Sequence, residues 1–74
     1  MKLKQLGSNK TVVSYDNGLE VFFSYETPVA AYCPNRGYIK TKTNYSRTTS
    51  KHINQWLPGS ALEVDQTELN GLTA

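Results

Sequence analysis

The dipeptide Asn17-Gly18 separates two runs of β-branched and aromatic residues, and this arrangement constrains the fold more than any other feature. Residues 11–15 (Thr-Val-Val-Ser-Tyr) precede it, and residues 19–25 (Leu-Glu-Val-Phe-Phe-Ser-Tyr) follow it. Asn and Gly both tolerate the positive φ of a type I′ turn, so Asn-Gly between two such runs is the strongest short-range signal of a β-hairpin. We therefore expect an antiparallel hairpin over residues 11–25.

Further short strands are expected over residues 2–6, 29–32 and 38–43, because turn-forming residues separate these extended runs. In the strand that ends the hairpin, one face is the better core face; it carries Leu19, Val21, Phe23 and Tyr25. Phe22 is then an aromatic side chain among polar neighbours. In the strand over 38–43, one face should contact water; it carries Tyr38, Lys40 and Lys42.

The hydrophobic period changes near residue 49, which predicts a helix over 49–57. Hydroxyl residues 48–50 can cap its start, and Pro58-Gly59 ends it. Its apolar stripe is expected to dock on the sheet; it consists of Thr49, Ile53, Trp56 and Leu57.

These patterns predict a small α+β fold. It consists of an antiparallel β-meander of four or five strands, curled or barrel-like, with one short helix packed on it. An SH3-like or OB-like barrel is compatible with this pattern. The globular domain is expected to span residues 1–58. Residues 59–74 form an acidic C-terminal tail, for which a short helix and a frayed end both remain open.

The small numbers of cysteine and histidine residues argue against a fold stabilised by disulfides or by a bound metal ion. The chain of 74 residues has one cysteine, Cys33, and one histidine, His52. Neither a disulfide within the chain nor a four-ligand zinc site can form from these. No cofactor motif is present. The sequence shows no apolar stretch of membrane-spanning length and no signal peptide, so we expect a cytoplasmic protein that does not enter a membrane.

Catalysis needs a constellation of side chains that this sequence does not assemble. Cys33 and His52 are the nucleophile and base on offer, and they lack a group that would orient them. Cys33 lies beside Pro34 at a turn, where nothing local would activate a thiol. A binding protein is therefore expected rather than an enzyme.

Basic residues interleaved with aromatic ones are the first candidate for a binding surface. Such a surface pairs phosphates with cations and stacks bases on rings. The candidate residues are Arg36, Tyr38, Lys40, Lys42, Tyr45, Arg47 and Lys51. The alternative is that lysines simply solvate an exposed strand face. The net charge of +2 is low for a dedicated nucleic-acid-binding protein.

Contact with another protein is the second candidate. The five tyrosines, the out-of-pattern Phe22 and the segregated charges suit a small contact patch. The basic residues lie between Cys33 and His52, whereas the chain after Gly59 carries carboxylates and no Lys or Arg.

Three stretches resemble a family of short uncharacterised proteins of tailed bacteriophages. They are Asp16-Asn17-Gly18 with residues 21–25 (Val-Phe-Phe-Ser-Tyr), residues 27–30 (Thr-Pro-Val-Ala), and residues 45–57 (Tyr-Ser-Arg-Thr-Thr-Ser-Lys-His-Ile-Asn-Gln-Trp-Leu). The last stretch is the specific part. The resemblance covers roughly the first 58 residues and leaves the acidic tail outside.

The resemblance transfers no functional residue, but a phage origin implies a place of action in the host cytoplasm. By analogy with small phage inhibitors, the chain is expected to bind and inhibit or redirect a host protein complex, with host RNA polymerase as the leading candidate. A nucleic-acid-binding module is the first alternative. An inhibitor of a host defence complex is the second.

Overall fold

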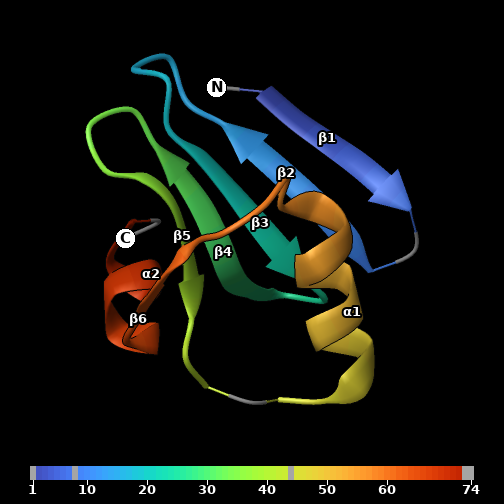
Figure 1. Cartoon of the computed structure of the whole chain (residues 1–74). Coiled ribbons are helices and arrows are strands. Elements are labelled where there is room, and N and C mark those ends of the chain that lie inside the picture. Colours follow the sequence, from blue (N-terminus) through green and yellow to red (C-terminus); the bar gives the residue numbers. More distant parts are fainter. Residues whose placement is uncertain (1, 8, 44, 73–74) are drawn as a thin grey trace.

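A single mixed β-sheet and two short helices make up the part of the chain described by the computed structural model, namely residues 2–7, 9–43 and 45–72 (Figure 1). The elements follow the chain as β1 (Lys2–Gly7), β2 (Lys10–Ser14), β3 (Glu20–Ser24), β4 (Thr27–Cys33), β5 (Gly37–Thr41), α1 (Arg47–Trp56), β6 (Leu62–Val64) and α2 (Gln66–Leu72). The predicted α+β class is confirmed.

The strands lie in the sheet in their order along the chain, β1-β2-β3-β4-β5-β6. Neighbours from β1 to β5 are antiparallel, which confirms the predicted meander. β6 then pairs in parallel with β5, with Thr41 opposite Val64. A parallel pair needs a crossover connection, and α1 supplies it. This sixth strand was not predicted. The sheet over the described residues is also open, so the barrel-like alternatives are wrong.

The predicted hairpin joins β2 and β3, but its turn differs from the expected type I′. The Gly18 amide donates to the Tyr15 carbonyl at 3.1 Å, and the Tyr15 amide donates to the Leu19 carbonyl at 2.8 Å. Gly18 has a φ of 93°, whereas Asn17 keeps a negative φ. The Asn17 side-chain oxygen accepts from the Leu19 amide at 3.1 Å. This is a type I turn followed by a glycine bulge, a common alternative in hairpins.

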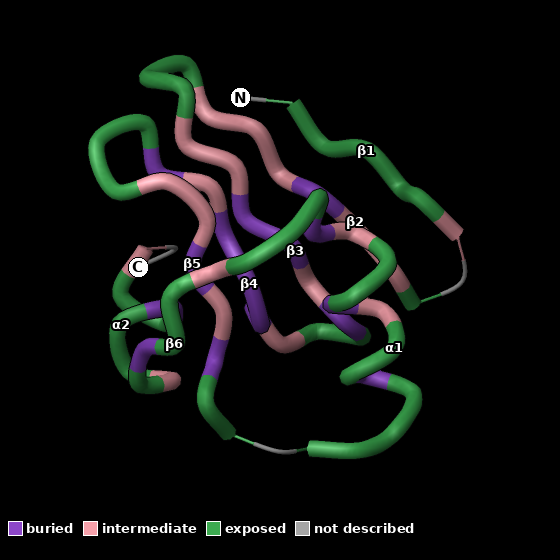
Figure 2. The backbone as a smooth tube through the Cα atoms, viewed as in Figure 1, coloured by how far each residue is buried: buried purple, intermediate pink, exposed green. Residues whose placement is uncertain are grey.

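Alternate residues of the central strands supply two apolar cores, one on each face of the sheet. Figure 2 shows the buried segments running along β3 and β4. The core under α1, the α1 core, consists of Val12, Phe22, Val29, Ala30, Ile53 and Leu57. The core under α2, the α2 core, consists of Val21, Ala31, Cys33, Ile39, Val64 and Leu69.

Burial on both faces overturns the position expected for Phe22. Its ring is fully buried in the α1 core and stacks on Trp56, so it does not lie on the surface. The face expected to be wet on β5 is also partly covered. Tyr38 and Lys40 are half-buried, and Lys42 is exposed. The reason is that α1 packs on the face that strand alternation alone would leave to solvent.

Helix α1 begins two residues before its predicted start at Thr49 and ends next to Leu57 as expected. Ser46 is the N-cap, and its hydroxyl accepts from the Thr49 amide at 3.1 Å. Thr49, Ile53 and Leu57 are buried against the sheet, which confirms the predicted docking stripe.

The segment expected to be an acidic tail forms strand β6, which joins the sheet, and helix α2, which packs on the sheet. Val64 of β6 and Leu69 of α2 are buried in the α2 core. The Gln66 side-chain amide donates to the Pro28 carbonyl at 2.7 Å, so α2 is also joined to β4 by a hydrogen bond. The acidic residues of this segment, Glu63, Asp65 and Glu68, are exposed. Residues 73–74 of the predicted tail lie outside the described residues.

Candidate functional site

Five of the eight predicted site residues line two adjoining surface hollows beside α1. The hollows have volumes of about 600 and 260 Å³ and share Ser50 and Asn54 along their common wall. We call the combined surface the α1–β5 groove. Its basic and aromatic lining consists of Lys40, Lys42, Tyr45, Arg47 and Lys51. The fold thus brings together residues from the end of β5, the following loop and one side of α1.

The half of the groove along α1 carries exposed positive charge. Arg47 and Lys51 lie one helical turn apart on exposed positions of α1, a helix that contains no acidic residue. Among the described residues, neither of them has a carboxylate within ion-pair distance. Tyr45 stands beside them with 47% of its surface exposed. Polar side chains at Ser50 and Asn54 complete this wall.

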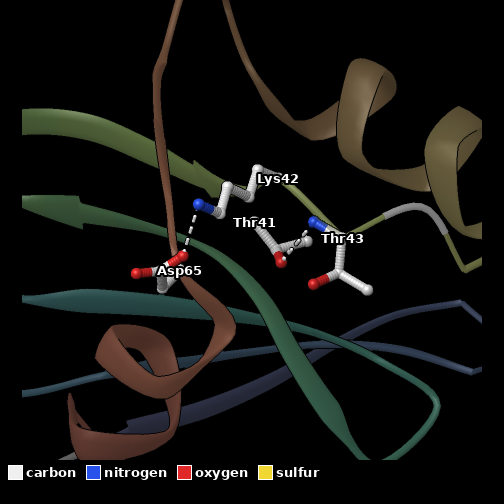
Figure 3. Close-up of polar contacts among 4 residues, drawn as sticks. All are labelled: Thr41, Lys42, Thr43 and Asp65. Atoms are coloured by element: carbon white, nitrogen blue, oxygen red, sulfur yellow. Dashed lines mark hydrogen bonds and ion pairs between the residues drawn. The ribbon is translucent and has the colours of Figure 1, made fainter.

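The half of the groove along β5 is electrostatically balanced. The Lys42 ammonium lies 2.7 Å from the Asp65 carboxylate (Figure 3). This hydrogen bond, followed by the attraction between the two charges, raises the pKa of Lys42 above its ordinary value. Lys40 stands opposite Glu63 in the β5–β6 pair. The two halves therefore differ in the charge they present to a ligand.

The strand that carries these lysines ends at a local hydrogen bond. The Thr41 hydroxyl accepts from the Thr43 amide at 3.1 Å (Figure 3). The Lys42 amide donates to the Val64 carbonyl at 2.9 Å. Thr41 is buried, so this turn is fixed against the sheet. These contacts set the position from which Lys42 reaches the groove.

The other three predicted residues lie outside the groove. Arg36 lies between β4 and β5 and pairs with Glu68 of α2 at 3.6 Å, on the opposite side of the sheet. Tyr38 packs its ring against Tyr32 and edge-on against Trp56, with centroids 4.8 and 5.7 Å apart. Phe22 is in the α1 core, as described above. Sequence spacing placed these residues near the others, but the sheet separates Arg36 from the groove, and the rings of Phe22 and Tyr38 are taken up by the α1 core.

The structure does not assemble Cys33 and His52 into a nucleophile–base pair. Cys33 is buried in the α2 core. His52 lies across the sheet on α1, where its Nδ1 is 3.1 Å from the Ser24 hydroxyl. The Ser24 hydroxyl also lies 3.3 Å from the Thr49 hydroxyl. These three polar side chains join α1 to β3. Thr49 was predicted to dock on the sheet, but its contact with Ser24 was missed because Ser24 lies on a strand face predicted to be exposed.

The groove residues Ser46, Ser50, Asn54 and Gln55 were also missed. A usable signal existed for the helical ones, since Ser50, Asn54 and Gln55 lie outside the predicted apolar stripe.

The described residues form a small α+β domain, in which an open β-sheet has one helix on each face and a basic groove on its surface. The exposed groove residues can form ion pairs and hydrogen bonds with a ligand. The chain belongs to a family of unknown function, DUF8033, whose model matches residues 1–71. The match includes β6 and nearly all of α2, so the C-terminal segment belongs to the family domain and not outside it. No curated protein and no solved structure matches the chain. None of the helices in the described residues is long and apolar enough to cross a membrane.

Proposed function

We propose that the protein is a non-enzymatic nucleic-acid-binding module that holds phosphate groups along the α1–β5 groove. The observation that carries the proposal is the pair Arg47 and Lys51, exposed one turn apart with no carboxylate beside them among the described residues. Cations without a carboxylate partner can neutralise phosphates and so release the counterions condensed around a nucleic acid, and this release is the main source of affinity for nucleic acids.

The remaining lining of the groove suits the same ligand. Hydroxyl and amide side chains at Ser50 and Asn54 can donate to phosphate oxygens, the commonest protein contact to a nucleic-acid backbone. Tyr45 adds an exposed ring on which a base can stack. Charge, donors and an aromatic surface thus lie along one continuous groove.

The small number of cations limits the expected affinity and salt dependence. Within the described part of the chain, two groove cations have no carboxylate within ion-pair distance, and two others face Asp65 and Glu63. For two to four phosphate contacts on a single strand, log Kd should change with log salt with a slope of magnitude about 1.4–2.8. We therefore expect weak binding. The affinity should fall steeply with rising salt only if about four phosphates are contacted.

The test is charge reversal at the uncompensated half of the groove. The variant R47E/K51E should lose binding to a fluorescein-labelled oligonucleotide, measured by anisotropy at low and moderate salt. The matched control K2E/K4E changes the net charge equally on exposed positions of β1, away from the groove. Binding that falls equally in both variants would show only nonspecific attraction and would reject the groove. Circular dichroism verifies that both variants fold.

Reversal at Lys40 and Lys42 is the less decisive experiment. Lys42 already pairs with Asp65, so Lys42→Glu would place two carboxylates together and disturb the end of β5. A loss of binding by such a variant would therefore not distinguish a disturbed fold from a lost contact with the ligand.

Binding to a host protein complex is the second candidate, and a different surface favours it. Apolar side chains are exposed where α2 does not cover the sheet. They line a shallow hollow formed by Leu3, Val13, Phe23 and Tyr25, and Leu3 is 71% exposed. Exposed apolar patches are typical of contact sites. Together with the phage resemblance, this supports a regulator acting in the host cytoplasm, with RNA polymerase as the leading target.

The second candidate is tested with purified bacterial RNA polymerase in place of lysate. The labelled protein should bind the enzyme after nuclease treatment, and Leu3→Asp should abolish binding while R47E/K51E retains it. Absence of binding at micromolar enzyme would reject RNA polymerase as the target.

A further inference from the structure

A further hollow opens beside the α1–β5 groove and shares part of its lining. It has a volume of about 240 Å³ and lies between the β3–β4 turn and the start of α1. Tyr45 and Ser46 line both this hollow and the groove. Tyr25 is also part of the lining of this hollow. We call this hollow the two-tyrosine pocket.

Tyr25 is held in the pocket wall by an unusual backbone conformation. It and Glu26 form the two-residue connection between β3 and β4, and Tyr25 has a φ of 60°. A first turn residue with positive φ is ordinarily glycine, because a Cβ is disfavoured there. Here the position carries a large aromatic side chain that is 53% exposed. An exposed ring kept at a strained position is typical of a residue used for contact.

The lining of the pocket combines aromatic rings with hydroxyl groups. Tyr25 lies near the imidazole of His52, with ring centroids 6.4 Å apart, which leaves the rest of the ring accessible. Linked hydroxyls belong to the same lining: Ser46 donates to Thr49 at 3.2 Å, and Thr49 lies 3.3 Å from Ser24. Aromatic walls offer faces for stacking, and hydroxyls offer donors and acceptors to the edge of a planar ring.

Building on the proposed function, we propose that the two-tyrosine pocket receives one unpaired base of a single-stranded nucleic acid. The base stacks between Tyr25 and Tyr45, while Arg47 and Lys51 hold the neighbouring phosphates in the groove. Tyr45 and Ser46 line both the pocket and the groove, so the two sites are neighbours. The base and the phosphate of one nucleotide are neighbours in the same way. A base within a duplex is stacked on both faces and cannot enter, so the ligand is a single strand.

The decisive variant is Tyr25→Gly. Glycine removes the ring and relieves the positive φ, so the folded state should be as stable as the wild type or more stable. Affinity for a short oligothymidine should nevertheless fall about 5- to 100-fold, the loss expected for one stacked base. The matched variant Tyr25→Phe keeps the ring and should bind like the wild type. An oligouridine of equal length tests whether RNA is bound as well as DNA, and weaker binding of either strand by Tyr25→Gly than by the wild type supports the pocket.

A position-specific probe separates stacking from general attraction. An oligothymidine carrying one 2-aminopurine should change its fluorescence on binding to the wild type and to Tyr25→Phe. The change should be absent with Tyr25→Gly. A duplex of the same length should bind more weakly than the single strand and should be insensitive to Tyr25→Gly.

The outcomes distinguish this inference from the proposed function. If Tyr25→Gly binds the single strand like the wild type while R47E/K51E does not bind, the groove stands and the pocket is rejected. Equal affinity for duplex and single strand also rejects the pocket. If the wild type binds no oligonucleotide at low salt, both proposals are wrong.

Discussion

The ring of Phe22 on β3 stacks on the indole of Trp56 on α1, with centroids 5.2 Å apart and planes inclined by 8°. Tyr38 on β5 meets the same indole edge-on, with centroids 5.7 Å apart. The three rings join two strands to the helix, and they form the aromatic part of the α1 core. The position of α1, and with it one wall of the groove, depends on this contact.

Replacing Phe22 by alanine should destabilise the protein by about 3–5 kcal/mol, because the fully buried ring leaves a cavity that the stacked indole cannot fill. Urea unfolding followed by the fluorescence of the single tryptophan, Trp56, measures the change. Leu3→Ala is the matched control, since Leu3 is exposed and its truncation should change stability by less than about 0.5 kcal/mol. A small effect of Phe22→Ala would contradict the buried position of the ring.

Replacing Leu69 by alanine should cost about 2–5 kcal/mol, since this side chain of α2 is fully buried in the α2 core. Thr67→Ala changes an exposed residue of the same helix and serves as the control. Thermal and urea unfolding would show the difference. If the two variants were equally stable, α2 would not be an integral part of the domain.

Replacing Ser24 by alanine should cost about 1–3 kcal/mol, because it removes the buried hydroxyl that contacts both Thr49 and His52. Ser60→Ala, at an exposed position, is expected to be neutral. Equilibrium unfolding compares the variants. Stability unchanged by Ser24→Ala would mean that the hydroxyl cluster does not hold α1 on the sheet.

Replacing Asp65 by asparagine should lower the pKa of Lys42 toward its ordinary value of 10.5, because the partner that raises it is lost. The Glu68 amide donates to the backbone carbonyl of residue 65, which the substitution retains, so the start of α2 should persist. A group with a raised pKa adds stability below its unfolded pKa and loses it as the pH rises through the folded pKa. The contribution should therefore be constant near neutral pH and disappear only above about pH 10.5.

An NMR titration of the Lys42 side chain, in the wild type and in Asp65→Asn, measures this shift directly. Lys40 provides an internal reference in the same spectra. Equal midpoints for Lys42 in the two proteins would exclude a persistent pair in solution.

The groove was only partly predictable, and the reason is geometric. Strand alternation correctly placed Lys40 and Lys42 on one face, and local sequence placed Tyr45, Arg47 and Lys51 just beyond it. Alternation does not say which face another element covers. Arg36 and Tyr38 were therefore grouped with residues from which the turn and the α1 core separate them.

Local chemistry in the sequence alone determined the β2–β3 hairpin and α1. Asn17 and Gly18 favour a reversal whatever surrounds them, and the apolar stripe from Thr49 to Leu57 defines a helix with one docking face. Tertiary structure decided the burial of Phe22, the parallel pairing of β6 and the inclusion of α2. Each depends on contacts between residues far apart in the chain: the stack on Trp56, the β5–β6 ladder and the apolar layer around Leu69. Such contacts arise only when both faces of the sheet are covered, which no local pattern encodes.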